Sequence, residues 1–343
     1  MKESTISFYN KNYKKFLIIP ALLIVISFAI IIHTYSSTGD FLHRDVSLTG
    51  GTTISIFSNI SVDSLQQALE KNFSDVSTRA LLDNSGKQTQ IIIVTRESPE
   101  TITPVIEQFL GHKLDPKNSS IEFTGSSLSK DFYQQLLIAV ILAFFWMSAV
   151  VFIIFSKKFK IKFLAIVLNL LLGIFLGVFF LSLNVIISVV IFLAFVISLF
   201  YIYIKYSIPS FAVIICAFAD ILMTLAVIDL FGMQISGAGI VAFLMLIGYS
   251  VDTDIILTTR VLRRKQTSVN HEIFGSFKTG MTMTLTAIAA VAIALFFVYP
   301  FQTALNQIFI ILLVGLFFDI LNTWVTNTIL IKWFAEHNGQ SYS

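Results

Sequence analysis

The chain has 343 residues, of which 56% are hydrophobic and only 13% are charged, and its formal net charge is +3. Soluble domains carry about 25% charged residues, so this composition excludes a disordered chain, a nucleic-acid-binding domain and a simple soluble enzyme. It indicates a polytopic membrane protein. The single cysteine, Cys216, lies in an apolar run, which excludes a disulfide framework and a cysteine-based metal site.

Eight segments are predicted to span a membrane, because a spanning helix needs about 20 mostly apolar residues. They lie at 16–33, 134–155, 163–182, 185–204, 211–231, 238–257, 281–299 and 306–331. No cleavage site of signal-peptide type follows the first segment, so we expect an uncleaved anchor.

Basic residues mark alternate loops between these spans. Lysine and arginine cluster before the first span and after the second, fourth, sixth and eighth, whereas the turns at 183–184, 232–237 and 300–305 carry none. Because cytoplasmic loops are enriched in basic residues, we expect both termini in the cytoplasm, the spans in the cytoplasmic membrane and residues 36–133 outside the cell.

The polar segment 36–133 has 8 basic and 12 acidic residues, a formal charge of −4. Its hydrophobic pattern predicts strands and helices in the order βαββαβ, the ferredoxin-like split-βαβ motif. The predicted elements are a strand at 46–57 interrupted by Gly50 and Gly51, a helix at 63–73, strands at 77–82 and 88–94 around a turn at 83–86, a helix from Ser98, and a strand at 120–124. We expect an interaction module rather than a catalytic domain.

Five aspartates lie inside predicted spans: Asp220, Asp229, Asp252, Asp254 and Asp319. On translocon-insertion scales a carboxylate at mid-helix costs about 2.5–3.5 kcal/mol, so intramembrane acids are functional candidates by default. Asp229 lies at the external end of its span, where we expect it to meet water. The other four suit reversible protonation, and the alternative is that they form fixed ion pairs with Lys or Arg that hold helices together.

The sixth span has the densest polar pattern, from Gly248 to Asp254. Residues two apart on a helix point about 200° away from each other, so Asp252 and Asp254 cannot face the same partner. The seventh span begins with Lys278 and continues with a hydroxyl-rich stretch that includes Thr282. These hydroxyls serve either transport or close helix–helix packing.

The sixth span resembles the SecD/SecF family, membrane subunits that assist protein export, within the RND group of transporters. The similar segments are Gly248–Asp254 followed by Arg260, Ala219–Ala226, Lys278–Thr286, Asp319–Trp324 with Asn327 in an archaeal-like form, and Leu48–Thr52 around Gly50 and Gly51. Two features depart from the family pattern. The family has six spans rather than eight, and Ser47 replaces an acid common before the glycine pair.

The resemblance implies a subunit of SecF type in an α-helical bundle of RND/SecDF type, working with a SecD-like subunit, the Sec translocon channel and unfolded exported polypeptide in the lipid membrane. It implies an ion path through Asp220, Asp252, Asp254 and Lys278, with Asp252 favoured over Asp254. Asp319 is added because of its predicted burial. Supporting positions are Tyr249, Ser250, Thr253 and Thr282 on helix faces, and the structural glycines Gly50, Gly51 and Gly248.

The expected organisation has five parts: 1–35 with the first span, the external domain 36–133, 134–210 with an extra helix pair, a core at 211–332 and a tail at 333–343. We expect no cofactor, metal or nucleic acid, and a coupling ion that is H⁺ or Na⁺. A P-loop and the Gly-x-Gly-Asp element of intramembrane proteases are absent from the sequence, so we expect no enzyme. The alternative function is a stand-alone RND-like exporter of small hydrophobic molecules.

Overall fold

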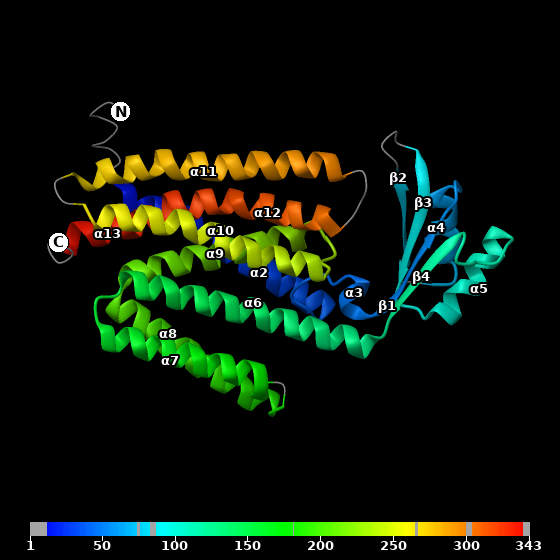
Figure 1. The fold of residues 1–343 in the computed structure, drawn as a ribbon, viewed down its shortest axis with the longest axis horizontal. Helices are drawn as coiled ribbons and strands as arrows, with labels where there is room; N and C mark the ends of the chain where they lie inside the picture. The colour runs from blue at the N-terminus through cyan, green and yellow to red at the C-terminus, as the bar shows by residue number, and fades with distance from the viewer. Residues whose placement is uncertain are drawn as a thin grey trace.

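The computed structural model describes residues 12–73, 76–82, 87–180, 182–264, 267–299 and 304–338. Within these ranges eight helices are long and apolar enough to cross a membrane, which confirms the predicted number. They run side by side, and a small sheet domain stands at one end of the bundle (Figure 1). The chain is therefore a multi-pass membrane protein.

The helices of the bundle are longer than their apolar stretches, because polar turns extend them at their ends. They are η1 (Tyr13–Leu17) with α2 (Ile18–Thr38), α6 (Ser126–Phe155), α7 (Phe159–Ile174) with η2 (Phe175–Phe179), α8 (Val185–Tyr206), α9 (Ile208–Leu230), α10 (Gly237–Leu262), α11 (Val269–Val298), and α12 (Ala304–Leu321) with η4 (Asn322–Asn327) and α13 (Thr328–Asn338). The turns η2 and η4 are π-helical.

Burial differs strongly between helices. The apolar window of α9 is 67% buried and that of α10 is 56% buried, whereas that of α11 is only 6% buried. Helix α9 packs on α2, α6, α8, α10 and α12, so it forms the centre of the bundle. Helices α7 and α8 form a hairpin beside α6 and α9, at the flank opposite α11 (Figure 1).

The extramembrane domain contains four antiparallel strands in the order β2-β3-β1-β4. Its elements are β1 (Gly51–Ile56), α4 (Val62–Glu70), β2 (Val76–Leu82), β3 (Gln88–Thr95), α5 (Pro99–Leu110) and β4 (Ser119–Thr124). Both helices cover one face of the sheet (Figure 1), where isoleucines of β1 and β3 pack against leucines and isoleucines of α4 and α5. The predicted βαββαβ order is confirmed.

The first strand begins later than predicted. Residues Val46–Thr49 form a short helix, α3, because the carboxylate of Asp45 accepts a hydrogen bond from the amide of Val46 at 2.6 Å. Gly50, at φ 86°, ends this helix, and β1 starts at Gly51. The predicted turn at 83–86, and the ends of the chain at 1–11 and 339–343, lie outside the described residues.

Candidate functional site

Three carboxylates from three neighbouring helices are buried in the bundle. Asp220 comes from α9, Asp254 from α10 and Asp319 from α12, and each side chain is at most 1% exposed. The three helices all pack on one another. We call these three residues the carboxylate cluster.

The π-helical turn η4 supplies hydrogen-bond donors to all three acids. The amide of Asn322 donates to Asp220 Oδ1 at 2.6 Å, the amide of Asn327 donates to Asp254 Oδ1 at 2.8 Å, and the hydroxyl of Thr323 donates to Asp319 Oδ1 at 3.3 Å. Because α12 continues directly into η4 and α13, Asp319 and its partners belong to one continuous span. Single π-helical turns within α-helices occur frequently at functional sites.

Helix α10 contributes further hydrogen-bonding groups to the carboxylate cluster. The hydroxyl of Ser250 donates to Asp220 Oδ2 at 2.5 Å. Thr253 and Thr258 are buried on the same helix, and Thr258 Oγ1 accepts a further contact from the Asn327 amide at 3.4 Å. These groups are neutral, so among the described residues the three carboxylates accept hydrogen bonds from hydroxyls and amides and form no ion pair with a cation.

Within the part of the chain that the structure describes, Oδ2 of Asp254 is a buried atom of the carboxylate cluster without a hydrogen-bond partner. The same holds for two neighbours of the cluster acids, Oδ1 of Asn327, whose amide donates to Asp254, and Oγ1 of Thr224, one helical turn after Asp220. An unpaired buried carboxylate oxygen costs free energy unless it takes up a proton or a cation. The arrangement can therefore bind and release a small positive ion.

The outer face of α10 holds the remaining predicted residues of this helix. Gly248, Tyr249 and Asp252 are exposed, and the Tyr249 side chain is 49% exposed. The predicted divergence of Asp252 and Asp254 is thus present, and Asp254 is the one that points into the bundle. Asp252, which the family resemblance favours, lies outside the carboxylate cluster.

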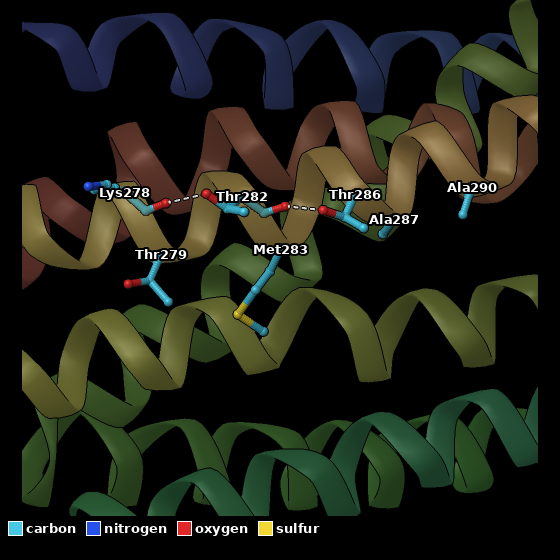
Figure 2. A pocket seen from close by; sticks show the side chains of 7 residues that line it. All are labelled: Lys278, Thr279, Thr282, Met283, Thr286, Ala287 and Ala290. Carbon is cyan, nitrogen blue, oxygen red and sulfur yellow. Dashed lines mark hydrogen bonds between the residues drawn. The ribbon is translucent and has the colours of Figure 1, made fainter.

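Lys278 and Thr282 also lie apart from the carboxylate cluster. They line an open cavity of about 700 Å³ along α11, together with residues from Thr279 to Ala290 (Figure 2). Thr282 donates to the carbonyl of Lys278 at 2.8 Å, and Thr286 donates to the carbonyl of Thr282 at 2.7 Å. These hydroxyls are therefore satisfied by their own helix.

Two site features differ from or go beyond the sequence expectations. Asp229 does not meet water as expected, since it is 4% exposed and its carboxylate lies 3.5 Å from Nδ1 of His43. The direct pairing of Asn322, Thr323 and Asn327 with the three acids was not predicted. Its signal in the sequence is the run of polar residues that follows Asp319 in an otherwise apolar span.

Comparison with known proteins matches this core to one family. Residues 180–337, which contain the whole carboxylate cluster, match the family model described as protein export membrane protein SecD/SecF, C-terminal. The protein-export membrane protein SecF of Methanocaldococcus jannaschii is 30% identical over 328 residues, which cover 94% of this chain and 96% of that protein. SecF of Pyrococcus furiosus is 26% identical over 343 residues, covering 99% and 97%.

A solved structure supports the fold. The crystal structure of SecDF, described as a translocon-associated membrane protein from Thermus thermophilus, aligns with 94% of this chain at a TM-score of 0.57 and 14% sequence identity. This chain spans 38% of that longer SecDF chain. With the sequence match extending over almost the full length of the archaeal SecF proteins, the chain belongs to the SecD/SecF family of protein-export membrane proteins, as a member of SecF type.

Proposed function

We propose that this chain is the SecF-type subunit of a protein-export complex and that its carboxylate cluster carries the coupling ion. Uptake and release of H⁺ or Na⁺ by Asp220, Asp254 and Asp319 would drive the movement that promotes translocation of unfolded polypeptide. The observation that carries this proposal is the set of three buried carboxylates, from three helices packed on one another, that accept hydrogen bonds from neutral hydroxyl and amide donors.

The hydrogen bonds weigh against a purely structural role as ion pairs. None of the ion pairs in the described part of the chain involves a carboxylate of the cluster. A carboxylate that is buried in a medium of low dielectric constant resists ionisation unless a cation accompanies it, because burial disfavours the charged form. Protonation or cation binding at one of them is therefore the step that the geometry favours.

The second part of the proposal is a SecD-like partner on the outer face of α10. Asp252 lies ten residues before the end of this helix, about 15 Å along its axis at about 1.5 Å per residue. A carboxylate exposed to lipid costs up to about 2.5–3.5 kcal/mol, the insertion-scale value at the centre of a spanning helix. A second membrane subunit that covers Asp252 and Tyr249 would remove this cost. We include in the proposed interface the open cavity along α11, which Lys278 lines.

The remaining assignments follow from the same proposal. Both termini lie in the cytoplasm, and the extramembrane domain faces outward, where it meets the Sec translocon channel and emerging polypeptide. No enzymatic step is assigned to the chain.

The alternative function, an exporter of small hydrophobic molecules, would need a second copy of the chain to cover Asp252. Purification of the chain in mild detergent separates the two functions. A co-purified SecD-like protein favours the protein-export subunit, and a homo-oligomer contradicts it.

Replacement of the cluster acids tests the ion-carrying role. We expect Asp254→Asn to slow export of a secreted reporter protein at least tenfold at equal abundance of the chain and to remove its dependence on the ion gradient. The substitution keeps the size of the side chain, so packing is preserved. Asp252→Asn is the matched control at nearly the same depth, and its export should still respond to the gradient. A normal response in the Asp254→Asn variant would contradict the proposal.

A further inference from the structure

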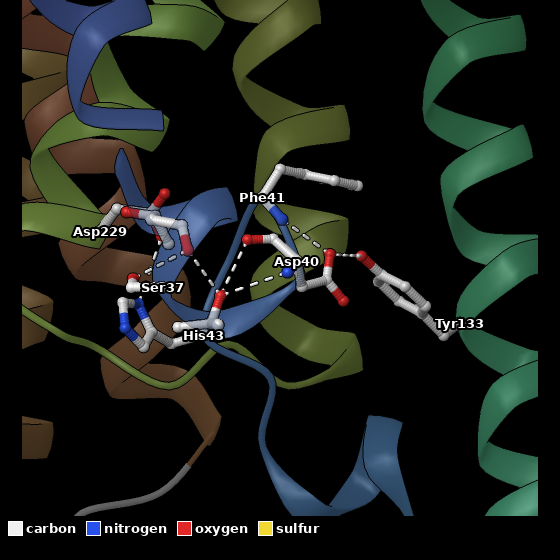
Figure 3. Close-up of polar contacts among 8 residues, drawn as sticks. Ser37, Asp40, Phe41, His43, Tyr133 and Asp229 are labelled. Carbon is white, nitrogen blue, oxygen red and sulfur yellow. Dashed lines mark hydrogen bonds and ion pairs between the residues drawn. The ribbon is translucent and has the colours of Figure 1, made fainter. Parts of the chain in front are cut away.

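One ionisable pair lies apart from the carboxylate cluster, at the end of the bundle that meets the sheet domain. It joins His43, in the linker between α2 and α3, to Asp229, at the end of α9 (Figure 3). Nδ1 of the imidazole lies 3.5 Å from Oδ1 of the carboxylate. The Asp229 side chain is fully buried, whereas that of His43 is 33% exposed. One member of the pair is therefore accessible to water and the other is not.

The carboxylate of Asp229 depends on His43 for a counter-charge. Within the part of the chain that the structure describes, no other ion pair involves Asp229, and neither of its carboxylate oxygens has a hydrogen-bond partner. A buried charge is costly unless it is paired. The pair is therefore stable when it holds one proton, and it leaves a negative charge buried without compensation when it holds none.

The other charged groups beside this pair are engaged with one another. Oδ2 of Asp40 pairs with Nε of Arg44 at 2.6 Å, and the hydroxyl of Tyr133 on α6 donates to Oδ1 of Asp40 at 3.1 Å (Figure 3). A guanidinium stays charged throughout the pH range in which proteins are folded, so this ion pair is permanent. Because Arg44 is occupied by Asp40, it does not replace His43 as the counter-charge of Asp229.

The remaining elements packed on the end of α9 contribute neutral groups. On α2, Ser37 lies beside the pair, and its hydroxyl donates to the carbonyl of Thr34 at 3.0 Å (Figure 3). The loop 231–236 and the first turns of α10 and α12 contain no charged residue. The proton content of the pair is therefore decided by its own two members.

Uncharged contacts keep the linker beside α9. The amide of Ile235 donates to the carbonyl of His43 at 2.7 Å, and the amide of Asp45 donates to the carbonyl of Ile235 at 3.0 Å. Leu42 is 4% exposed and belongs to the same buried apolar cluster as Ile228 of α9. These contacts do not change with pH, so His43 stays beside Asp229 in either charge state. The proton therefore changes the strength of the attachment and not its position.

The sheet domain follows this attachment after a few residues. Asp45, two residues after His43, caps α3 by accepting from the amide of Val46 at 2.6 Å, and β1 begins at Gly51. His43 also lines a cavity of about 710 Å³ between the linker, the start of α6 and the end of β3. Water in this cavity can exchange protons with the imidazole.

We propose that His43 and Asp229 form a proton-binding site that acts as a latch between the linker of the sheet domain and α9. With one proton bound, the pair is neutral overall and ties the linker to the helix that also carries Asp220. Without the proton, the buried carboxylate has no counter-charge and the attachment weakens. Imidazole side chains change charge between about pH 5 and 8, so the latch responds to the acidity on its own side of the membrane. This role is independent of the proposed ion path.

Thermal unfolding of the full chain in neutral detergent, at about pH 5 and about pH 8, tests this proposal. The unfolded chain exposes Asp229 to water, so loss of the proton from the pair weakens only the folded state, and the contribution of the pair to stability falls as pH rises. We expect Asp229→Asn, which keeps the size of the side chain, to lower the melting temperature by about 2–4 °C at about pH 5. At about pH 8 it should not lower it.

Two histidine variants separate the pair from general effects of pH. We expect His43→Gln to lower the melting temperature at the acidic pH only, as Asp229→Asn does. His112→Gln is the matched control, because His112 is an exposed histidine after α5 whose Nδ1 contacts only the neighbouring carbonyl of Lys113, at 3.1 Å, among the contacts of the described chain. It should melt like the unmodified chain at both pH values.

Hydrogen–deuterium exchange of residues 39–46 measures the linker directly. After correction for the intrinsic pH dependence of exchange, we expect these amides to exchange faster at the higher pH in the unmodified chain and equally at both pH values in Asp229→Asn. A loss of stability in Asp229→Asn that is the same at both pH values would overturn the proposal, because the pair would then be a structural contact alone. The same pH response in His112→Gln as in His43→Gln would also overturn it.

Discussion

The two faces of α10 each present one aspartate, but the two aspartates lie in opposite environments. On the inner face, Asp254 is fully buried, and Asn327 donates to it at 2.8 Å. On the outer face, Asp252 is exposed next to Tyr249. The polar residues of the inner face are hydrogen-bonded within the chain, whereas Tyr249 and Asp252 on the outer face are exposed.

Steric contacts also differ between the inner and outer faces of α10. A Cβ atom on Gly280 of α11 would lie 2.6 Å from the ring of Trp324 and 2.8 Å from Cγ2 of Thr253, so the inner elements are in close contact. A Cβ atom on Gly248 would meet no atom within 4 Å. The comparison therefore predicts that packing defects on the inner face affect folding and that bulk on the outer face affects only assembly.

The largest expected effect on stability comes from Gly280→Val. The added methyl groups overlap the rigid Trp324 ring, and overpacking of this kind costs about 1–3 kcal/mol. Unfolding of the purified chain in mixed micelles measures the loss. Gly248→Val is the control, because it makes the same replacement within a helix at an open position, and it should change stability by less than about 0.5 kcal/mol. Equal losses would remove the distinction between the two faces.

The fold could be predicted from sequence because its signals are local. Eight apolar stretches and the alternation of strands and helices in 36–133 are visible one segment at a time, and the structure has both. The ends of the helices were harder to predict from the sequence. Helix α11 starts at Val269, twelve residues before its predicted apolar span, because the Ser268 side chain caps it and its first turns are polar.

The site was only partly predictable because its geometry depends on neighbouring helices. The two-residue spacing predicts that Asp252 and Asp254 diverge, but both faces of α10 carry polar residues among apolar ones, so the inward direction is decided by the packing of α9 and α12. The π-helical turn η4 changes the angular spacing after Asp319. A regular helix would place Asn322 and Asn327 about 140° apart, whereas a π-helical turn brings residues five apart closer to one face, so the regular period does not predict that both amides reach acids of the same cluster.

Bulk on the outer face should weaken partner binding. We expect Gly248→Trp to reduce recovery of the SecD-like partner at least tenfold, equivalent to about 1.4 kcal/mol of binding free energy, while unfolding of the isolated chain stays unchanged. Gly177→Trp is the matched control, since Gly177 lies at an equally open position in η2, on the flank opposite α11. If both variants lose the partner to the same degree, the outer face of α10 is not the interface.

The smallest expected effect on stability comes from a hydroxyl outside the carboxylate cluster. It tests whether a buried hydrogen bond affects export only when it involves a carboxylate of the cluster. In the α7–α8 hairpin, the amide of Asn169 donates to the Tyr203 hydroxyl at 3.2 Å, and it also donates to the carbonyl of Ala165 at 2.8 Å. Tyr203→Phe leaves the second bond in place, so we expect a loss of about 0.6 kcal/mol, the average for such bonds in membranes, and unchanged export.

Ser250→Ala removes the same group, one hydroxyl, from the carboxylate cluster. It leaves Asp220 Oδ2 without its donor at 2.5 Å, and an unsatisfied buried acceptor costs about 1–3 kcal/mol. We expect this variant to lose more stability than Tyr203→Phe and also to alter the ion dependence of export. Similar behaviour of the two variants would mean that the hydroxyl of Ser250 contributes to packing alone, since only a hydrogen bond to a titrating carboxylate couples stability to the ion.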